Sequence, residues 1–174
     1  MTFSELPVEP ALTREQSARI RRINALDLLQ MQGLDDVAGR IAAALDQPYA
    51  MVNVITNVQA FVGLYSAPGM PPVGRTMRVD HGYCPALLDR DAALVLPDVQ
   101  AWARFSSNPV VDQVGIRTYV GAPLPDPDTG IVLGTVCAVG TQALPLSTGR
   151  HSLAVIKTFQ AEVTELITVR ARSY

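Results

Sequence analysis

Two pairs of β-forming segments, each joined by a short turn-forming segment, limit what this chain can fold into. Residues 117–124 and 131–140 have the composition of strands, and Pro-Asp-Pro-Asp-Thr-Gly at 125–130 consists of residues that favour turns. A second pair, residues 49–55 and 60–65, is rich in β-branched and aromatic side chains and is joined by a connection of hairpin length. Because hairpin strands pair antiparallel, the sequence predicts an antiparallel sheet.

Helical patterns occupy both ends of the chain. Thr13-Arg14-Glu15-Gln16 has the form of a capping box. Apolar residues then recur at helical spacing, first at Ile20, Ile23, Leu26 and Leu29 and, after a break at Gln32-Gly33, at Leu34, Val37, Ala38, Ile41, Ala42 and Leu45. The closing helix is predicted to begin near Ser147 and to place on one face Leu153, Ile156, Phe159, Val163 and Leu166. Helices segregated from strands predict an α+β fold with the helices mainly on one face of the sheet.

The segment between the two hairpins, residues 66–115, is called the excursion below. It is too long and too rich in proline and glycine to be a simple connection, and long segments of this kind usually carry function. Within it the sequence predicts an exposed loop at 66–74, a short helix within 80–89, a short strand at 94–96 and helical turns after Asn108-Pro109.

Composition and charge exclude several function classes. A chain of 174 residues, 48% hydrophobic and 17% charged, folds into a domain rather than a disordered tail. A formal net charge of -2 supplies no basic excess for nucleic acid, and the longest apolar runs, such as 131–139, are too short to cross a membrane. Residues 1–10 lack the pattern of a secretory signal, and two cysteines make no disulfide framework. We therefore expect a cytoplasmic protein with an N-terminal extension at 1–12 and one domain at 13–174.

Several short motifs follow one another along the second half of the chain. They are Leu96-Pro97-Asp98, Arg104-Phe105, Asn108-Pro109, Arg117-Thr118-Tyr119-Val120-Gly121-Ala122-Pro123-Leu124, Gly134-Thr135-Val136-Cys137 and Leu144-Pro145-Leu146-Ser147. In this order and spacing they resemble the motifs of a GAF domain, a small-molecule-sensing relative of PAS that is often fused to bacterial histidine kinases and phosphodiesterases. The resemblance implies a central antiparallel sheet of five to six strands, with the N- and C-terminal helices packed on one face and the excursion on the other.

A ligand pocket between the excursion and the sheet also follows from the resemblance. We expect the ligand-binding residues to be Phe61, His81, Tyr83, Cys84, Trp102, Phe105, Arg117 and Tyr119. The same aromatic and arginine side chains also fit an ordinary core, with a buried ion pair between Arg104 and Asp98. Cys84 is either a reactive thiol near the start of a short helix or a small core side chain, and Cys137, in an apolar strand, is predicted to be a core residue.

No metal ion or other cofactor is expected. His81 and His151 are the only histidines, and no Cys or His spacing typical of a metal site occurs. Haem-binding GAF domains supply a histidine in the segment that corresponds to 110–116, which has none, and bilin-binding relatives use a Cys-His pair where this chain has Cys84-Pro85. Nothing similar to the N-K-x-F-D-E signature of cyclic-nucleotide-binding GAF domains is present.

These observations predict a regulatory domain without catalytic activity that binds a small-molecule ligand, forms a homodimer through its terminal helices and acts with a signalling partner. One alternative is a thiol-based reductase that resembles free methionine-(R)-sulfoxide reductase, which needs a nucleophilic and a resolving thiol. Cys84 stands roughly where one cysteine of that family falls. The principal catalytic cysteine of the family is expected within residues 108–117, which contain no cysteine, and Cys137, on a strand, is expected to be badly placed to act as the resolving thiol. The other alternative is a dimerisation scaffold whose pocket is filled by its own side chains.

Overall fold

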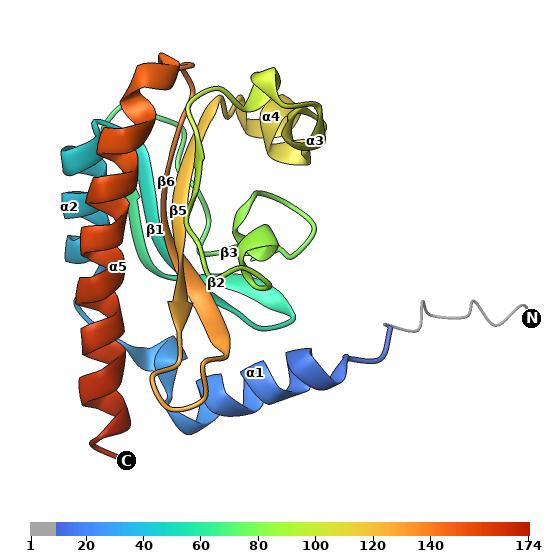
Figure 1. The fold of residues 1–174 in the computed structure, drawn as a ribbon, viewed down its shortest axis with the longest axis vertical. Helices are drawn as coiled ribbons and strands as arrows, with labels where there is room; N and C mark the ends of the chain where they lie inside the picture. The colour runs from blue at the N-terminus through green and yellow to red at the C-terminus, as the bar shows by residue number, and fades with distance from the viewer. Residues whose placement is uncertain (1–9) are drawn as a thin grey trace, which may run out of the picture.

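A six-stranded antiparallel sheet forms the centre of the computed structural model, which describes residues 10–174 (Figure 1). The strand order is β3-β2-β1-β6-β5-β4, so the two predicted hairpins meet along β1 and β6. The predicted α+β class and antiparallel sheet are confirmed. The strands are β1 (Tyr49–Ile55), β2 (Val58–Ser66), β3 (Thr76–Arg78), β4 (Leu94–Leu96), β5 (Thr118–Pro125) and β6 (Val132–Gly140).

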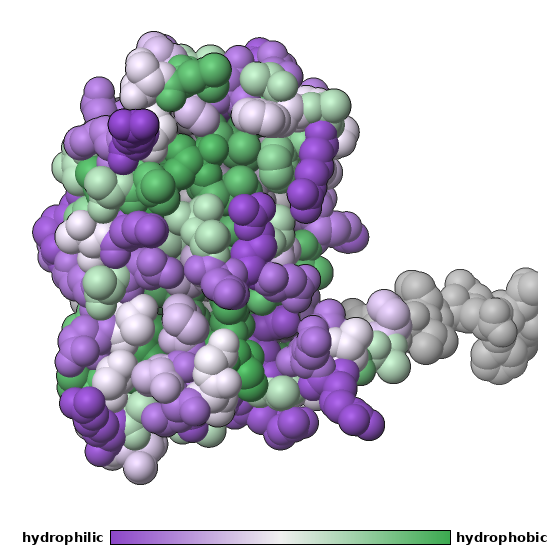
Figure 2. Space-filling model, viewed as in Figure 1, coloured by the Kyte–Doolittle hydropathy of each residue, from purple (hydrophilic) through white to green (hydrophobic). Residues whose placement is uncertain are grey.

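Helices cover one face of this sheet. The helices α2 (Leu34–Leu45) and α5 (Gly149–Ala171) pack along it, and α1 (Arg14–Ala25) crosses the end where β5 turns into β6 (Figure 1). Ile41 of α2 and Ile156 of α5 are fully buried in this layer, as their apolar stripes predict. In the same view, Figure 2 shows hydrophobic side chains gathered between α5 and the excursion.

The N-terminal helix begins where the sequence predicts. Thr13 N donates to Gln16 Oε1 at 2.7 Å, and Gln16 N donates to Thr13 Oγ1 at 3.1 Å, which completes the capping box. Of the expected extension at 1–12, residues 1–9 lie outside the described residues. Within residues 10–174, none of the helices combines the length and the apolar character that crossing a membrane requires.

The end of α1 differs from the prediction. The helix stops at Ala25, so the expectation that its apolar stripe continues through Leu29 is wrong: Leu28 is buried, whereas Leu29 is 41% exposed. A tertiary contact explains why the helix does not continue beyond Ala25. Arg170 of α5 donates from Nη2 to the carbonyl oxygen of Asp27 at 2.9 Å, and Asp27 takes a left-handed conformation with φ of 49°.

The excursion covers the opposite face of the sheet. It holds β3, β4, α3 (Ala103–Ser106), α4 (Pro109–Val114) and two 3₁₀ turns, at Cys84–Leu87 and Val99–Ala101; two more 3₁₀ turns, at Leu28–Gln30 and Leu146–Thr148, lie outside it. The helix predicted within 80–89 is only a 3₁₀ turn, with Pro85 in its first turn as expected. The three-residue strand β3, paired with the edge of β2, was not predicted, since proline and glycine dominate the sequence before it.

Candidate functional site

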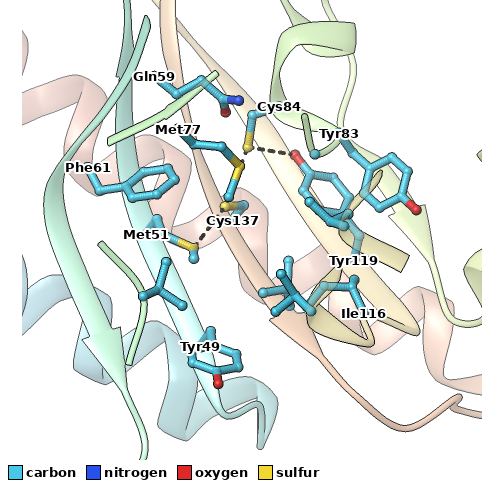
Figure 3. Close-up of a pocket in the computed structure, with 15 residues that line it drawn as sticks. Tyr49, Met51, Gln59, Phe61, Met77, Tyr83, Cys84, Ile116, Tyr119 and Cys137 are labelled. Carbon is cyan, nitrogen blue, oxygen red and sulfur yellow. Dashed lines mark hydrogen bonds between the residues drawn. The ribbon is translucent and has the colours of Figure 1, made fainter. Parts of the chain in front are cut away.

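A small cavity lies between the sheet and the excursion (Figure 3). It measures about 60 Å³; strands of the sheet form its floor and the excursion forms its cover. A single water needs roughly 10–15 Å³, so the cavity has room for a molecule of only a few heavy atoms. The floor includes Tyr49, Met51, Phe61, Tyr119 and Cys137, and the cover includes Met77, Tyr83, Cys84, Val110 and Val114.

Hydrogen bonds to the backbone fix the cover in place. Gly82 N donates to Asn108 Oδ1 at 2.9 Å, and Asn108 Nδ2 donates back to Gly82 O at 2.7 Å. Gly82 has a φ of 74°, a conformation that only glycine adopts readily. From the floor, Tyr49 Oη donates to Pro71 O at 2.7 Å. The Gly82–Asn108 bonds therefore join two parts of the cover, and the cover is joined to the sheet by Tyr49 and by the pairing of β3 with β2 and of β4 with β5.

The wall of the cavity is apolar. No acidic residue, basic residue or histidine is among the described side chains that line it. The amide side chain of Gln59 also lines the cavity, but both of its polar atoms already make hydrogen bonds. Gln59 Nε2 donates to Arg78 O and His81 O, each at 2.7 Å, and Oε1 accepts from Asn53 Nδ2 at 2.8 Å. Because burying an unpaired charge is costly, the wall suits a small uncharged molecule better than an ion.

Three sulfur atoms of residues that line the cavity form two successive contacts (Figure 3). Cys84 Sγ is 3.5 Å from Cys137 Sγ, which is 3.8 Å from Met51 Sδ. Both cysteines are buried and free. Burial of Cys137 in the core is thus confirmed, but the expectation that it is badly placed to meet a second thiol is wrong. The 3₁₀ turn of the excursion brings Cys84 over the central strand β6.

Buried polar groups surround the Cys84 thiol. Asn53 Oδ1 and Thr135 Oγ1 have no oxygen or nitrogen partner among the described residues, although both side chains are fully buried. Hydrogen bonding from Cys137, with further contributions from Thr135, Tyr119 and Asn53, outweighs burial and lowers the pKa of Cys84 to about 7. The same hydrogen bond and burial raise the pKa of Cys137 well above its ordinary value. Cys84 is therefore the more nucleophilic of the two thiols.

The structure brings half of the predicted ligand-binding residues together at the cavity. Phe61, Tyr83, Cys84 and Tyr119 all line it. Tyr83 and Tyr119 pack edge to face with ring centroids 5.3 Å apart. Their role in binding a ligand stays a prediction.

The other four predicted residues lie outside the cavity lining. Phe105 packs behind Tyr83, with ring centroids 5.7 Å apart, and Trp102 is 51% exposed. The side chain of His81 lies near Asp80, so only the His81 carbonyl oxygen reaches the network at the cavity. Arg117 donates its backbone N–H to Gly140 O in the sheet.

The buried ion pair between Arg104 and Asp98, the example given for an ordinary core, is not among the ion pairs of residues 10–174. Arg104 is exposed, and its guanidinium lies 5.3 Å from the centre of the Phe105 ring. Asp98 instead accepts a hydrogen bond from Gln100 N at 3.0 Å. This local turn occupies the carboxylate and removes the need for a distant partner.

Sequence reasoning missed Met51, Met77 and Val110 as cavity residues. Met51 alternates with Tyr49 along β1, so the two-residue period of a strand could have placed both on one face. Met77 and Val110 lie in the excursion, where the sequence carries no periodic signal.

Comparison with known protein families identifies this architecture. A family model described as the GAF domain matches residues 32–165, which is most of the chain. The chain belongs to the GAF family. No curated protein sequence matches it. The match includes the sheet, α2, the whole excursion and most of α5, so the cavity lies within the region that defines this GAF domain.

Solved structures with the same fold include proteins of different activity. The free methionine-R-sulfoxide reductase from Neisseria meningitidis, solved in complex with its substrate, aligns over 96% of this chain and 98% of its own, with a TM-score of 0.63 and 9% identity. The GAF domain of an Acinetobacter phosphoenolpyruvate-protein phosphotransferase aligns over 93% of this chain and 98% of its own, with a TM-score of 0.59 and 14% identity. The blue-light absorbing PixJ GAF domain of Thermosynechococcus elongatus aligns over 93% of this chain and 95% of its own, with a TM-score of 0.56 and 11% identity. At these identities the likeness shows the fold alone.

Proposed function

We propose that this GAF domain is a regulatory module of cytoplasmic signalling that binds a small uncharged molecule and has no catalytic activity of its own. The observation that carries the proposal is the cavity of about 60 Å³ between the sheet and the excursion. Its apolar wall favours a ligand with few polar atoms. Because the cavity lies between the sheet and the excursion, a ligand that occupies it changes the position of the excursion, which a signalling partner can detect.

Thermal-shift measurements with a panel of small molecules test this proposal. We expect small neutral alcohols or ketones to raise Tm and charged metabolites of similar size to leave it unchanged, since no acidic or basic residue lines the cavity. Val110→Ile places an extra methyl group in the cavity and should weaken the response. Val111→Ile, on the same short helix but outside the cavity lining, is the matched control. No response to any neutral ligand would favour the ligand-free scaffold.

A homodimer through the terminal helices is part of the proposal. Leu166 and Val169 on α5 are 40% and 53% exposed, so they are available to a second copy, whereas Phe159 is 9% exposed and belongs to the monomer core. Val169→Glu should therefore give a folded monomer by light scattering and circular dichroism. Leu146→Glu, exposed but before α5, should leave the dimer intact. A wild-type protein that scatters as a monomer at high concentration would contradict the proposal.

A second candidate, a thiol-based reductase, is favoured by the 3.5 Å contact between Cys84 Sγ and Cys137 Sγ. A nucleophilic thiolate beside a resolving thiol is what sulfoxide reduction needs. Free methionine sulfoxide, however, carries an ammonium and a carboxylate group, and no acidic or basic residue lines the cavity to pair with them. Thioredoxin-coupled turnover of free methionine sulfoxide that is lost in Cys84→Ser would support the reductase, and absence of turnover would leave the regulatory proposal alone.

A further inference from the structure

We propose that Cys84 and Cys137 form an intramolecular redox pair, which a small peroxide oxidises to a disulfide that ties the excursion to the centre of the sheet. The two sulfur atoms are 3.5 Å apart and belong to different layers of the fold. Cys84 opens the 3₁₀ turn of the excursion, and Cys137 lies on the central strand β6. The pair requires no regulatory ligand, so this proposal stands independently of the proposed function.

Hydrogen-bond donors around Cys84 prepare it to react as a thiolate. Tyr119 Oη lies 3.3 Å from Cys84 Sγ, and the pKa of Tyr119 is raised well above its ordinary value by burial, so the phenol keeps its proton. Thr135 is fully buried with a hydroxyl that has no oxygen or nitrogen partner among the described residues, and it contributes to the lowered pKa of Cys84. The Tyr119 and Thr135 hydroxyls therefore both favour the thiolate form of Cys84.

The cavity gives a small oxidant access to this thiol. Cys84 forms part of the cavity wall, and the cavity of about 60 Å³ is larger than hydrogen peroxide, which is only slightly bigger than water. Hydrogen peroxide is uncharged, so an apolar wall is a smaller barrier to it than to an ion. Cys137 also lines the cavity, which leaves both sulfur atoms close to the same oxidant.

The reaction balances in two steps. In the first, the Cys84 thiolate attacks one peroxide oxygen, an S–O bond forms, the O–O bond breaks, and the departing hydroxide takes up a proton to become water. In the second, Cys137 sulfur attacks Cys84 sulfur, the S–S bond forms, the S–O bond breaks, and the leaving hydroxide takes the Cys137 proton as water. Two thiols are oxidised and one peroxide is reduced to two waters.

The disulfide has a structural consequence. It closes a loop of about 50 residues that contains most of the excursion. Cross-linking a loop of this length restricts the unfolded chain and stabilises the folded one. It also fixes the cover of the cavity to the floor, so the oxidised protein has a cover that cannot lift from β6 near Cys84.

The test uses the full chain, first reduced with dithiothreitol and then freed of it. Treatment with stoichiometric hydrogen peroxide should remove both titratable thiols measured in denaturant and should lower the intact mass by two hydrogen atoms. Tm should rise by on the order of 10 °C. Renewed reduction should restore both thiols and the original Tm. In Cys137→Ser, Cys84 should be trapped as a sulfenic acid that reacts with dimedone, whereas in Cys84→Ser the Cys137 thiol should remain unreacted.

Three results would overturn the proposal. Wild-type protein that keeps both thiols under peroxide, or that forms only disulfide-linked dimers on a non-reducing gel, would exclude an intramolecular pair. Oxidation by free methionine sulfoxide but not by peroxide would assign the pair to the reductase candidate instead. The wild-type measurements need no variant to fold, and a cavity that binds no ligand leaves their expected outcome unchanged.

Discussion

Replacing Thr135 with valine removes one buried hydroxyl and keeps the shape of the side chain on β6. Thr135 is fully buried, and its Oγ1 has no oxygen or nitrogen partner among residues 10–174. Burying such a group costs about 1–3 kcal/mol, and a contact with a thiol offsets only part of this cost. We expect Thr135→Val to raise the free energy of unfolding by about 1 kcal/mol, which raises Tm by about 2–4 °C in a chain of this length.

The same substitution should slow the chemistry of Cys84. The Thr135 hydroxyl contributes to the lowered pKa of Cys84, which is about 7. Without it the pKa rises, less thiolate is present at neutral pH, and alkylation at pH 7 should slow by roughly threefold. In the wild type the rate should rise with pH through about 7, because the thiolate is the reactive form.

Two measurements decide the outcome. Urea unfolding followed by circular dichroism gives the change in stability. Iodoacetamide labelling followed by peptide mass spectrometry gives the rate at Cys84 separately from that at Cys137, with the hydrogen bond between the two thiols left in place. A variant that is destabilised by more than about 1 kcal/mol would show that the hydroxyl has a structural partner. A more stable variant with an unchanged labelling rate would show that Thr135 does not act on the thiol.

Three further predictions concern the framework of the fold. Ile41→Ala should lower the free energy of unfolding by about 2–5 kcal/mol, because Ile41 is fully buried between α2 and the sheet; urea unfolding checks this, and a loss below about 0.5 kcal/mol would contradict the assigned helix face. Asp126→Asn should lower the free energy of unfolding by about 1–3 kcal/mol at neutral pH, since Arg22 Nε donates to the buried carboxylate at 2.7 Å. Burial raises the pKa of Asp126, but hydrogen bonds from Arg22, Thr129 and the Asp128 backbone, together with the charge of Arg22, outweigh burial and hold the pKa below its usual value. This stabilisation is therefore present above about pH 4 and is lost as pH falls through the folded pKa. Unfolding curves of wild type and variant should therefore converge in acid, and a constant difference would contradict the pairing. Gly134→Ala should prevent folding, because its Cβ would overlap the carbonyl oxygen of Asn53 on β1; a soluble variant with wild-type Tm would contradict the β1–β6 pairing.

Features that depend on neighbours in the sequence were predictable. The turn at 125–130, the capping box at Thr13 and the apolar stripe of α2 all arise from interactions within a few residues, and each is present in the structure. The boundary of α1 was not predictable in the same way, because the side chain that holds the chain after Ala25 is Arg170, at the far end of the sequence.

The sequence by itself determined the class of the fold, the antiparallel hairpins and the aromatic group that includes Tyr83 and Tyr119. Only the tertiary structure decided which of the candidate residues meet. Cys84 and Cys137 are 53 positions apart, and neither has a local pattern that points to the other. Their contact depends on two long-range events, the pairing of β6 in the middle of the sheet and the folding of the excursion over it. Which side chains are buried between the layers depends on this packing, and no local sequence pattern encodes it. For the same reason the exposure of Trp102 could not be predicted from the sequence.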